Sequence, residues 1–217
     1  MLNAKSVRLA VLIIAPLLPW ALRRLLYQSL FKWDLAKDAR IGFSYVDATH
    51  VRLGPGARIG HGNVVRGLGS LELRRGAVLK NFNSVFGTDN VATFPTRTLT
   101  IGEGSLVMSW HFIDTCGEVE IGRRTTIGGR STQIWSHARF FREGAPNLGP
   151  ARVKIGDDVY VGARATIAHC EIPDGATVAT GTVVTNAEAA GDLSGPLLFI
   201  GNPAEARERS GGNRQST

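Results

Sequence analysis

The sequence predicts an all-β protein in which one chain coils repeatedly around a single axis, a β-helix. Residues 155–185 divide into blocks of six, IGDDVY, VGARAT, the shortened IAHCE, IPDGAT and VATGTV, and an aliphatic residue opens each block. This period matches neither a lone helix nor a lone strand. It matches a chain that turns a corner after every block. The 26 glycines suit such corners, and the low aromatic content of 7% suits a narrow interior filled by aliphatic side chains.

We expect residues 1–35 to form an apolar helical segment before the β-helix. Leu9–Leu22 (LAVLIIAPLLPWAL) is apolar, contains two prolines and is flanked by basic residues. It is shorter than the roughly 20 residues of a spanning helix, and no small-residue cleavage site follows it. The aromatic and basic residues of an interfacial belt come next: Trp20, Arg23, Arg24, Tyr27, Lys32 and Trp33. The segment is therefore expected to lie on a membrane surface. The alternatives are a cap or an oligomer contact and, less favoured, a signal or spanning segment.

The β-helix itself is expected over residues 36–203, as about seven coils of roughly 18 residues. Its period is lost twice, over residues 77–97 and 138–153, where turn-rich sequence predicts loops that leave the stack. Residues 204–217 form a polar C-terminal tail, and its end is expected to be disordered. Before the last coils, the residues that open the blocks and are expected to point inward are Ile41, Asp47, Leu53, Ile59, Val65, Leu71, Ile101, Val107, Ile113, Val119, Ile121, Ile127 and Gln133.

Charge and cysteine content indicate which kinds of partner and which cellular compartment to expect for this protein. The net charge is +7, but the basic residues are dispersed and are not interleaved with aromatic residues, so nucleic acid ranks last among the expected partners. The two cysteines, Cys116 and Cys170, are too few for a disulfide framework. They indicate a reducing compartment.

His137 is the strongest catalytic candidate, because it ends a predicted strand directly before the second loop. A histidine in such a place can transfer protons near neutral pH. Asp114 lies about one coil earlier, where its carboxylate can orient the imidazole or bind a substrate hydroxyl. His111 is expected nearby. The alternative for each is a polar corner residue without a role. No two of the five histidines lie within five residues of each other, so no metal site is predicted.

Three segments make the chain resemble the hexapeptide-repeat acyltransferases, which are left-handed parallel β-helices. Within that family it is most similar to the sugar O-acetyltransferases of the galactoside, maltose and capsule-polysaccharide type. Residues 155–185 match the last coils of the family, and FIGNPAEA at 199–206 matches the GNPA segment that follows them. Residues 112–137 (FIDTCGEVEIGRRTTIGGRSTQIWSH) are similar to the run from an acceptor-site aspartate to a catalytic histidine. The resemblance covers residues 101–206 and reaches the first coils by period alone.

The resemblance implies a homotrimer that transfers an acetyl group from acetyl-CoA to a sugar hydroxyl, with His137 as general base in a direct attack. Asp114 and Trp135 would bind the acceptor. Glu205 stands where the family often has a basic residue, and the block at 167–171 is one residue short. The coenzyme A would contact residues in and after the last coils: Tyr160, Gly162, Ala163, Thr180, Gly181, Asn202, Pro203 and Arg207.

The expected acceptor is a polysaccharide or a lipid-linked glycan precursor, and the expected place is the cytoplasm, at the inner face of the membrane. The first alternative is an N-acyl- or formyltransferase acting on an amino-sugar nucleotide. A metal-dependent carbonic anhydrase of the same fold is the second, and the histidine spacing argues against it. The third is a non-catalytic β-helix that serves as a membrane-tethered scaffold.

Overall fold

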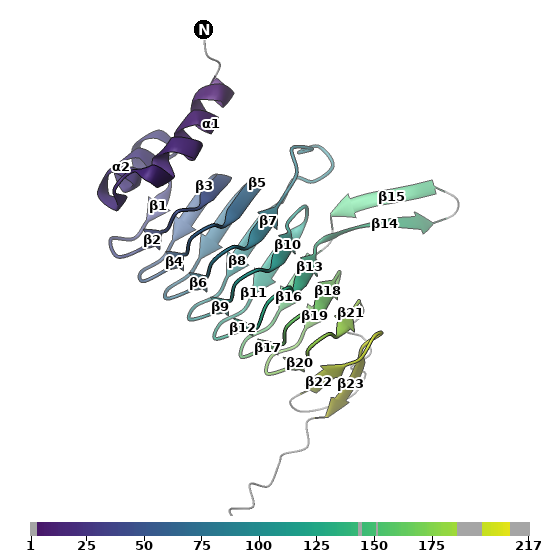
Figure 1. The fold of residues 1–217 in the computed structure, drawn as a ribbon. Coiled ribbons are helices and arrows are strands. Elements are labelled where there is room, and N and C mark those ends of the chain that lie inside the picture. The colour runs from purple at the N-terminus through teal and green to yellow at the C-terminus, as the bar shows by residue number, and fades with distance from the viewer. Residues whose placement is uncertain (1–3, 143–144, 151, 186–196, 209–217) are drawn as a thin grey trace, which may run out of the picture.

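The chain folds into two helices followed by a stack of parallel β-coils (Figure 1). The structure, a computed structural model, describes backbone and side chains at residues 7–137, 152–185 and 197–208. It describes the backbone alone at residues 4–6, 138–142 and 145–150. The predicted left-handed parallel β-helix with an N-terminal helical segment is confirmed. The last residues of the polar tail lie outside the described residues.

Each regular coil runs along three faces, and in most coils one short strand lies on each face. The first face is a sheet of β2 (Arg40–Ile41), β4 (Arg58–Ile59), β6 (Val78–Leu79), β9 (Leu106–Val107), β12 (Thr126–Ile127), β17 (Tyr160–Val161), β20 (Thr177–Val178) and β22 (Leu197–Ile200), closed by the antiparallel β23 (Glu205–Glu208). Among the described strands, β2 to β20 give seven levels, and β22 begins the next.

The second and third faces share the long strands β3 (Tyr45–Leu53) and β5 (Val64–Leu73), which bend from one face to the other. The second face continues with β7 (Ser84–Phe86), β10 (Phe112–Asp114), β13 (Gln133–Trp135), β18 (Thr166–Ala168) and β21 (Val183–Val184). The third face consists of β1 (Asp34–Leu35), the ends of β3 and β5, β8 (Thr98–Ile101), β11 (Glu118–Ile121), β16 (Arg152–Ile155) and β19 (Glu171–Ile172).

A column of aliphatic side chains fills the interior. On the first face the inward residues lie in register, as in Ile59 against Leu79 and Ile127 against Val161, and all four are at most 2% exposed. Most third-face strands place two residues inside, such as Leu71 and Leu73, whereas most second-face strands place one. A coil therefore often exceeds 18 residues, and the six-residue frame shifts at these strands.

Two of the expected inward positions are wrong, because the step from the first face to the second is five residues in one coil and seven in another, instead of six. The register of β3 changes between Val46 and Ala48, which are both buried, so Asp47 points outward and is half-buried. In β13 the inward residue is Ile134, with 0% exposure, and Gln133 is exposed. The aliphatic neighbour takes the inward position in each case, because an unpaired polar side chain would lose its hydration there.

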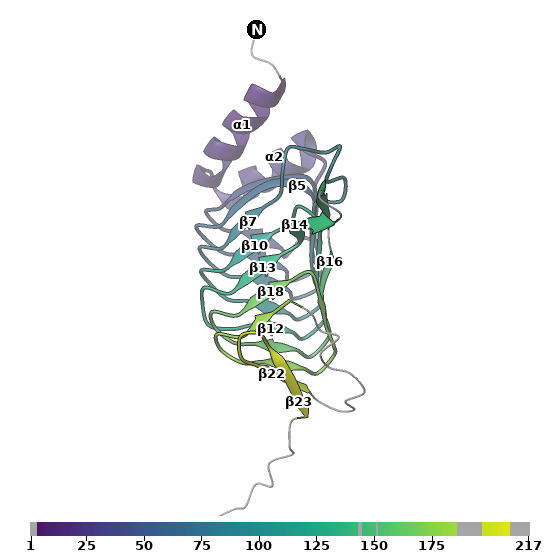
Figure 2. The same ribbon diagram turned by 90° about the vertical axis from the view of Figure 1, so that its right-hand side faces the viewer.

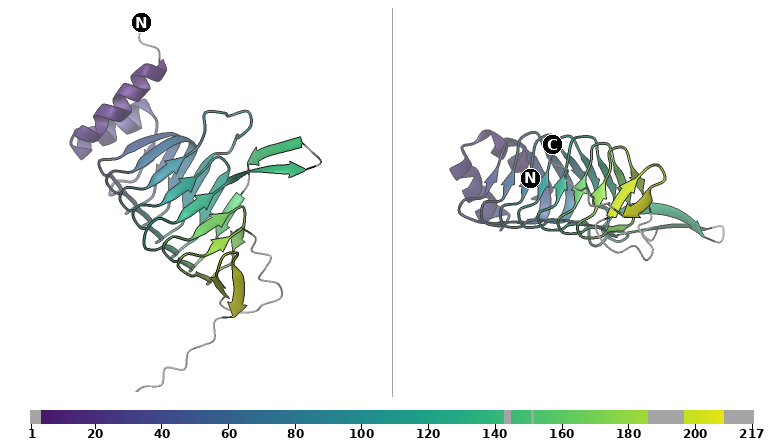
Figure 3. Two further views of the ribbon diagram at one scale, coloured as in Figure 1. Left: turned by 45° about the vertical axis from the view of Figure 1, so that its right-hand side comes forward. Right: turned by 90° about the horizontal axis from the view of Figure 1, so that it is seen from below.

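Two excursions leave the stack, and both differ from the expected loops. The coil stays regular through β6 and β7, so the first excursion covers only the residues between Phe86 and Thr98. The second is a hairpin of β14 (His137–Arg142) and β15 (Ala145–Pro150), whose antiparallel register pairs His137 with Pro150. Both project from the same side of the molecule (Figures 1 and 2), and the hairpin extends well beyond the coils (Figure 3).

The helices α1 (Ala4–Ile14), η1 (Ala15–Leu17) and α2 (Trp20–Leu30) cover the open end of the first coil. Tyr27 and Trp33 are 2% and 3% exposed, with ring centroids 4.7 Å apart. Both belong to the core, and Arg23 is also buried, so these members of the expected interfacial belt are part of a cap. No helix in the described part of the chain is long and apolar enough to cross a membrane.

Three arginines attach the cap through backbone carbonyls of the first coil. Arg8 Nη2 donates to Ala48 O at 2.7 Å and its guanidinium pairs with Asp47. Arg23 Nη1 donates to Gly42 O at 2.8 Å, and Arg24 donates to Lys37 O and Leu35 O. The first coil has no coil before it, so these side chains satisfy polar groups at an open end of the sheet.

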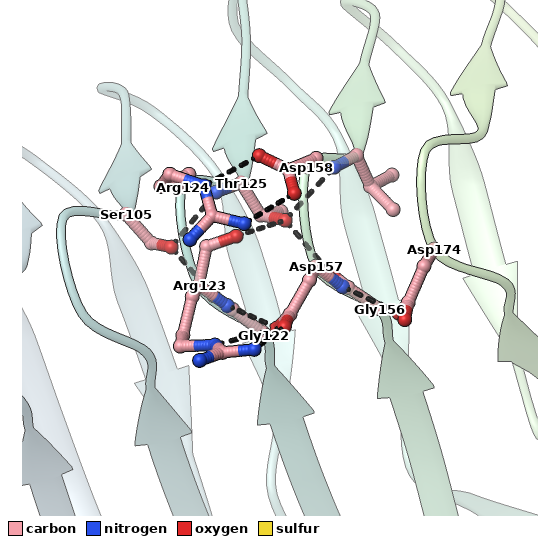
Figure 4. Close-up of polar contacts among 10 residues, drawn as sticks. Ser105, Gly122, Arg123, Arg124, Thr125, Gly156, Asp157, Asp158 and Asp174 are labelled. Atoms are coloured by element: carbon pink, nitrogen blue, oxygen red, sulfur yellow. Dashed lines mark hydrogen bonds and ion pairs between the residues drawn. The ribbon is translucent and has the colours of Figure 1, made fainter.

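Polar side chains hold successive corners together by hydrogen-bonding from one coil to the next. At the corner before the first face, Thr125 Oγ1 donates to Gly156 O at 2.7 Å and accepts from Val159 N at 3.0 Å. Asp157 Oδ1 accepts from Arg123 N, and Asp174 Oδ1 accepts from Asp157 N, as Figure 4 shows. Each bond spans neighbouring coils, so this corner resists the separation of coils.

We predict that Thr125→Val destabilises the protein by about 1–3 kcal/mol, because it leaves a buried donor and a buried acceptor without partners. The variant keeps the shape of the side chain. Thr126→Val is the matched control, since Thr126 points outward on β12 and should change stability little. Urea unfolding followed by circular dichroism measures both. Equal stability of the two variants would contradict a stabilising role for the corner.

Candidate active site

The structure brings His137 and Asp114 into direct contact. His137 begins β14, where the chain leaves the stack, and Asp114 ends β10 one coil earlier. His137 Nδ1 lies 2.7 Å from Asp114 Oδ2. The His137 side chain is 32% exposed and that of Asp114 only 5%. The buried carboxylate therefore accepts from Nδ1–H and leaves Nε2 as the basic nitrogen.

Ser136 fixes the carboxylate that orients the histidine. Its backbone N–H and its hydroxyl both donate to Asp114 Oδ2, at 3.0 and 3.1 Å. Ser136 Oγ also accepts from Gly117 N at 2.8 Å. This network locks the carboxylate in one position, which pre-organises the tautomer of His137.

Aromatic rings surround the dyad. Phe94, from the first excursion, meets the His137 ring edge-on at a centroid distance of 5.9 Å. Trp135 lies 6.5 Å from His137 and 4.8 Å from Phe112 of the coil below. Trp135 Nε1 donates to Gln133 Oε1, so its ring is held in place. The predicted acceptor residues Asp114 and Trp135 thus flank His137.

Three further residues of this corner were not predicted as site residues. Phe94 reaches it across an excursion, and Cys116 lies buried beside Asp114. His169 belongs to the next coil, and its backbone N–H donates to the backbone carbonyl of Trp135 at 3.3 Å. Burial and the nearby His137 lower the pKa of His169. Together with the predicted loops, the shortened block at 167–171 is a sequence signal that this corner differs from the others.

The same corner contains the one group of three metal-ligating side chains found in the described part of the chain. Ligand atoms of Asp114, Cys116 and His137 lie within 4.8 Å of one another. However, burial and the adjacent Asp114 raise the pKa of Cys116 to about 12, which disfavours the thiolate that a metal requires. Asp114 Oδ2 already accepts three hydrogen bonds. These donors suit a hydrogen-bonded dyad better than a metal centre.

His111 does not join this site, contrary to the expectation that it lies nearby. It precedes β10, at the opposite end of the second face, and is 2% exposed. Its Nδ1 accepts from Thr132 N, and its backbone N–H donates to Asn83 Oδ1. It therefore continues a column of buried polar side chains that begins at Ser44 and passes through Asn63 and Asn83 in the coils between. Burial lowers the pKa of His111 to about 4.

The residues expected to contact coenzyme A gather along another corner, between the first and second faces. Gly181 N donates to Ala163 O at 2.9 Å, so Gly162-Ala163 and Thr180-Gly181 are neighbours on successive coils. A Cβ on Gly162 would come within 2.8 Å of Thr180 N, so a small residue is required there. Gly201, before Asn202-Pro203, accepts from Val183 N and places that segment on the next level.

The two remaining residues of that set lie close by. Tyr160 on β17 is 51% exposed and its ring lies over Gly128. Arg207 on β23 pairs with Glu205 at 2.9 Å, and both side chains are exposed. This corner precedes strands β13 and β18, whereas His137 follows β13. A single chain therefore holds the two sets of predicted site residues at opposite ends of the second face.

Known proteins share this repeat and this fold. Residues 152–186 match the hexapeptide repeat of succinyl-transferase. The bifunctional protein GlmU of several Pseudomonas putida strains is 34% identical over 96 residues, which is 43% of this chain. The chain spans only 18% of the length of those relatives.

Two solved structures have a similar fold. The polySia-specific acetyltransferase NeuO has a TM-score of 0.52 and 15% identity, covering 82% of this chain and 80% of that chain. LpxA from Acinetobacter baumannii has a TM-score of 0.51 and 15% identity, covering 81% of this chain and 69% of that chain. The repeat and the fold confirm the predicted resemblance to the hexapeptide-repeat, left-handed β-helix proteins.

The buried His111 should make stability depend on pH. Its pKa is near 4 in the folded protein and near 6.5 when unfolded, so unfolding takes up a proton between these values. The contribution of the neutral His111 to the free energy of unfolding is fully present above pH 6.5. It falls as the pH drops toward 4, by roughly 2 kcal/mol down to pH 5. His111→Asn removes the titrating group and keeps an acceptor for Thr132 N.

We predict that His111→Asn reduces this loss between pH 7 and pH 5 by roughly 2 kcal/mol. Chemical unfolding at the two pH values measures it. His50→Asn is the control, because His50 is exposed on β3. An equal pH dependence in the wild type and in His111→Asn would show that His111 does not titrate as inferred.

Proposed function

We propose that this hexapeptide-repeat β-helix protein is an acetyl-CoA-dependent O-acetyltransferase that acts on a sugar hydroxyl of a polysaccharide or lipid-linked glycan. The observation that carries the proposal is the 2.7 Å contact between His137 Nδ1 and Asp114 Oδ2. It leaves Nε2 on a partly exposed ring, beside aromatic side chains, where a hydroxyl can approach. The match of the last coils to a transferase repeat supports the same chemistry.

The dyad can perform acyl transfer without a covalent enzyme intermediate. His137 Nε2 takes the proton of the acceptor hydroxyl while that oxygen attacks the thioester carbonyl. A new C–O bond forms, the C–S bond breaks, and Nε2–H returns the proton to the departing thiolate. Asp114 stabilises the imidazolium that exists between these steps, and Ser136 keeps the carboxylate in place.

The acceptor would bind over the aromatic side chains at this corner. Phe112 and Trp135 lie 4.8 Å apart on the outer surface of the second face, next to His137. Their rings offer an apolar platform for the face of a sugar, and Phe94 contacts the His137 ring edge-on. The excursion between β7 and β8 would therefore contribute to acceptor selection.

A complete site would need two copies of the chain. The corner of Gly162 and Thr180 and the corner of His137 lie at opposite ends of the second face. In a homotrimer, the small-residue corner of one subunit can face His137 of its neighbour, and coenzyme A would lie between them. Tyr160, Asn202, Pro203 and Arg207 would then line the outer part of the coenzyme A channel.

We predict that His137→Ala lowers kcat/KM for acetyl transfer by about 10²–10⁴-fold, because the general base is lost. Release of thiol from acetyl-CoA, measured with a panel of nucleotide sugars and polyprenyl-linked glycans, gives the rate. His50→Ala, at an exposed histidine on β3, should keep wild-type activity. Wild-type turnover by His137→Ala, with its circular dichroism unchanged, would rule out the mechanism.

We also predict that subunits complement one another. Thr180→Trp fills the exposed small-residue corner and His137→Ala removes the base, so each homotrimer alone should be inactive. Unfolding and refolding an equal mixture gives sites that draw His137 and Thr180 from different chains, and about one site in four has both. Recovery of about a quarter of the wild-type activity is expected. A mixture as inactive as its parents would place both residues in one subunit's site.

A further inference from the structure

A basic groove lies between the start of α2 and the outer surface of the first three coils, where Figure 1 places α2 beside β2. Its volume is about 430 Å³. Trp20 forms one wall, and Arg40 and Arg58 line the floor together with Lys80. Arg23 and His61 complete its basic side chains, and none of its described lining residues is acidic.

No described carboxylate neutralises the positive charges of Arg40, Arg58 and Lys80 in this groove. Arg40 and Arg58 are directly opposite each other on neighbouring strands, an arrangement in which like charges repel. Among the described residues, neither they nor Lys80 form an ion pair. Some exposed arginines in later coils do so, as in Arg123 with Asp157 and Arg152 with Glu120. The groove is therefore suited to an anion from outside the chain.

Beside this groove, the helices expose aliphatic side chains. Leu17 is 73% exposed and Leu25 is 64% exposed, and Ile13 and Leu22 are more than half exposed. An apolar cleft of about 280 Å³ opens between α1 and α2. Trp20 follows Leu17 by three residues and lines the basic groove, so it lies where the apolar surface meets the charged one.

We propose that this end of the protein binds the surface of a bilayer containing anionic phospholipids. The aliphatic side chains of η1 and α2 enter the acyl region, and the groove of Arg40, Arg58 and Lys80 takes the phosphates of the head groups. Trp20 lies at the interface between them, as amphipathic aromatic rings do. The inference concerns binding alone and does not depend on the proposed acyl transfer.

Lipid is favoured over other anions because the cap that borders the basic groove through Trp20 also exposes aliphatic side chains, with Leu17 only three residues before Trp20. Free phosphate or a nucleotide would use the groove but leave Leu17 and Leu25 unexplained. Nucleic acid would bind the charges and gain nothing from an apolar surface, since its backbone contacts are electrostatic. A bilayer with anionic head groups matches both parts of the surface at once.

Cosedimentation of the full chain with vesicles tests the proposal. Wild-type protein should bind vesicles of phosphatidylcholine with phosphatidylglycerol at least about tenfold more tightly than phosphatidylcholine alone. Each basic side chain near the surface strengthens such binding about fivefold, so Arg40→Gln/Arg58→Gln should weaken it about 25-fold. Leu17→Gln/Leu25→Gln should abolish binding to either kind of vesicle.

Arg130→Gln/Arg164→Gln is the matched control, because these exposed arginines lie in later coils, away from the helices. It should change vesicle binding less than about threefold, since the attraction falls off within a Debye length. Equal weakening by the control and the groove variant would overturn the assignment to this groove. So would a groove variant that loses affinity for inorganic phosphate or duplex DNA but keeps its affinity for vesicles.

The outcome is separable from the enzymatic proposal. His137→Ala should sediment with anionic vesicles as the wild type does, whether or not it transfers acetyl groups. A folded wild-type protein that does not bind anionic vesicles would refute the membrane proposal and leave the His137 mechanism intact.

Discussion

Hydrogen bonding between successive coils is the constraint on which the rest of the structure depends. Each strand bonds to the coil before it and the coil after it, so every corner must repeat closely enough to keep the register. A Cβ on Gly42 would lie 2.3 Å from Gly60 O, which shows how closely the corners stack. The same constraint leaves the first coil with unpaired carbonyls. Arg8, Arg23 and Arg24 satisfy them by reaching from the cap.

The candidate active site lies where this constraint is relaxed. The corner between the second and third faces holds the excursion after β7, the turn after β10, the hairpin after β13 and the shortened turn after β18. These four successive levels supply Phe94, Asp114, His137 and His169, respectively. Here the chain can leave the stack or shorten its turn, because the aliphatic column is maintained by the strands on either side. The coils thereby align groups that are far apart in the sequence.

The sequence is sufficient to predict the stack, the dyad and the neighbouring Trp135, but not the other residues around the dyad. The spacing from Asp114 to His137 is close to one coil, so their contact follows from the period once the fold is known. A six-residue frame places Asp47 and Gln133 inside wrongly, because the step from the first face to the second is five residues from Ile41 to Val46 and seven from Ile127 to Ile134. Phe94 could not be found from periodicity, since it returns to His137 through a segment that has none.

The N-terminal helices show how one pattern serves two purposes. An alternation of aromatic and basic residues is typical of a membrane interface, yet Arg23, Tyr27 and Trp33 are buried against the first coil. The pattern arises here because the open end of a β-helix exposes both apolar side chains and backbone carbonyls. Aromatic residues cover the apolar side chains, and arginines donate hydrogen bonds to the carbonyls. Burying these residues turns the aliphatic ones outward, Leu17 and Leu25 among them. The surface that we propose for a bilayer is therefore the outer side of the cap, together with the basic groove on the first face of the stack.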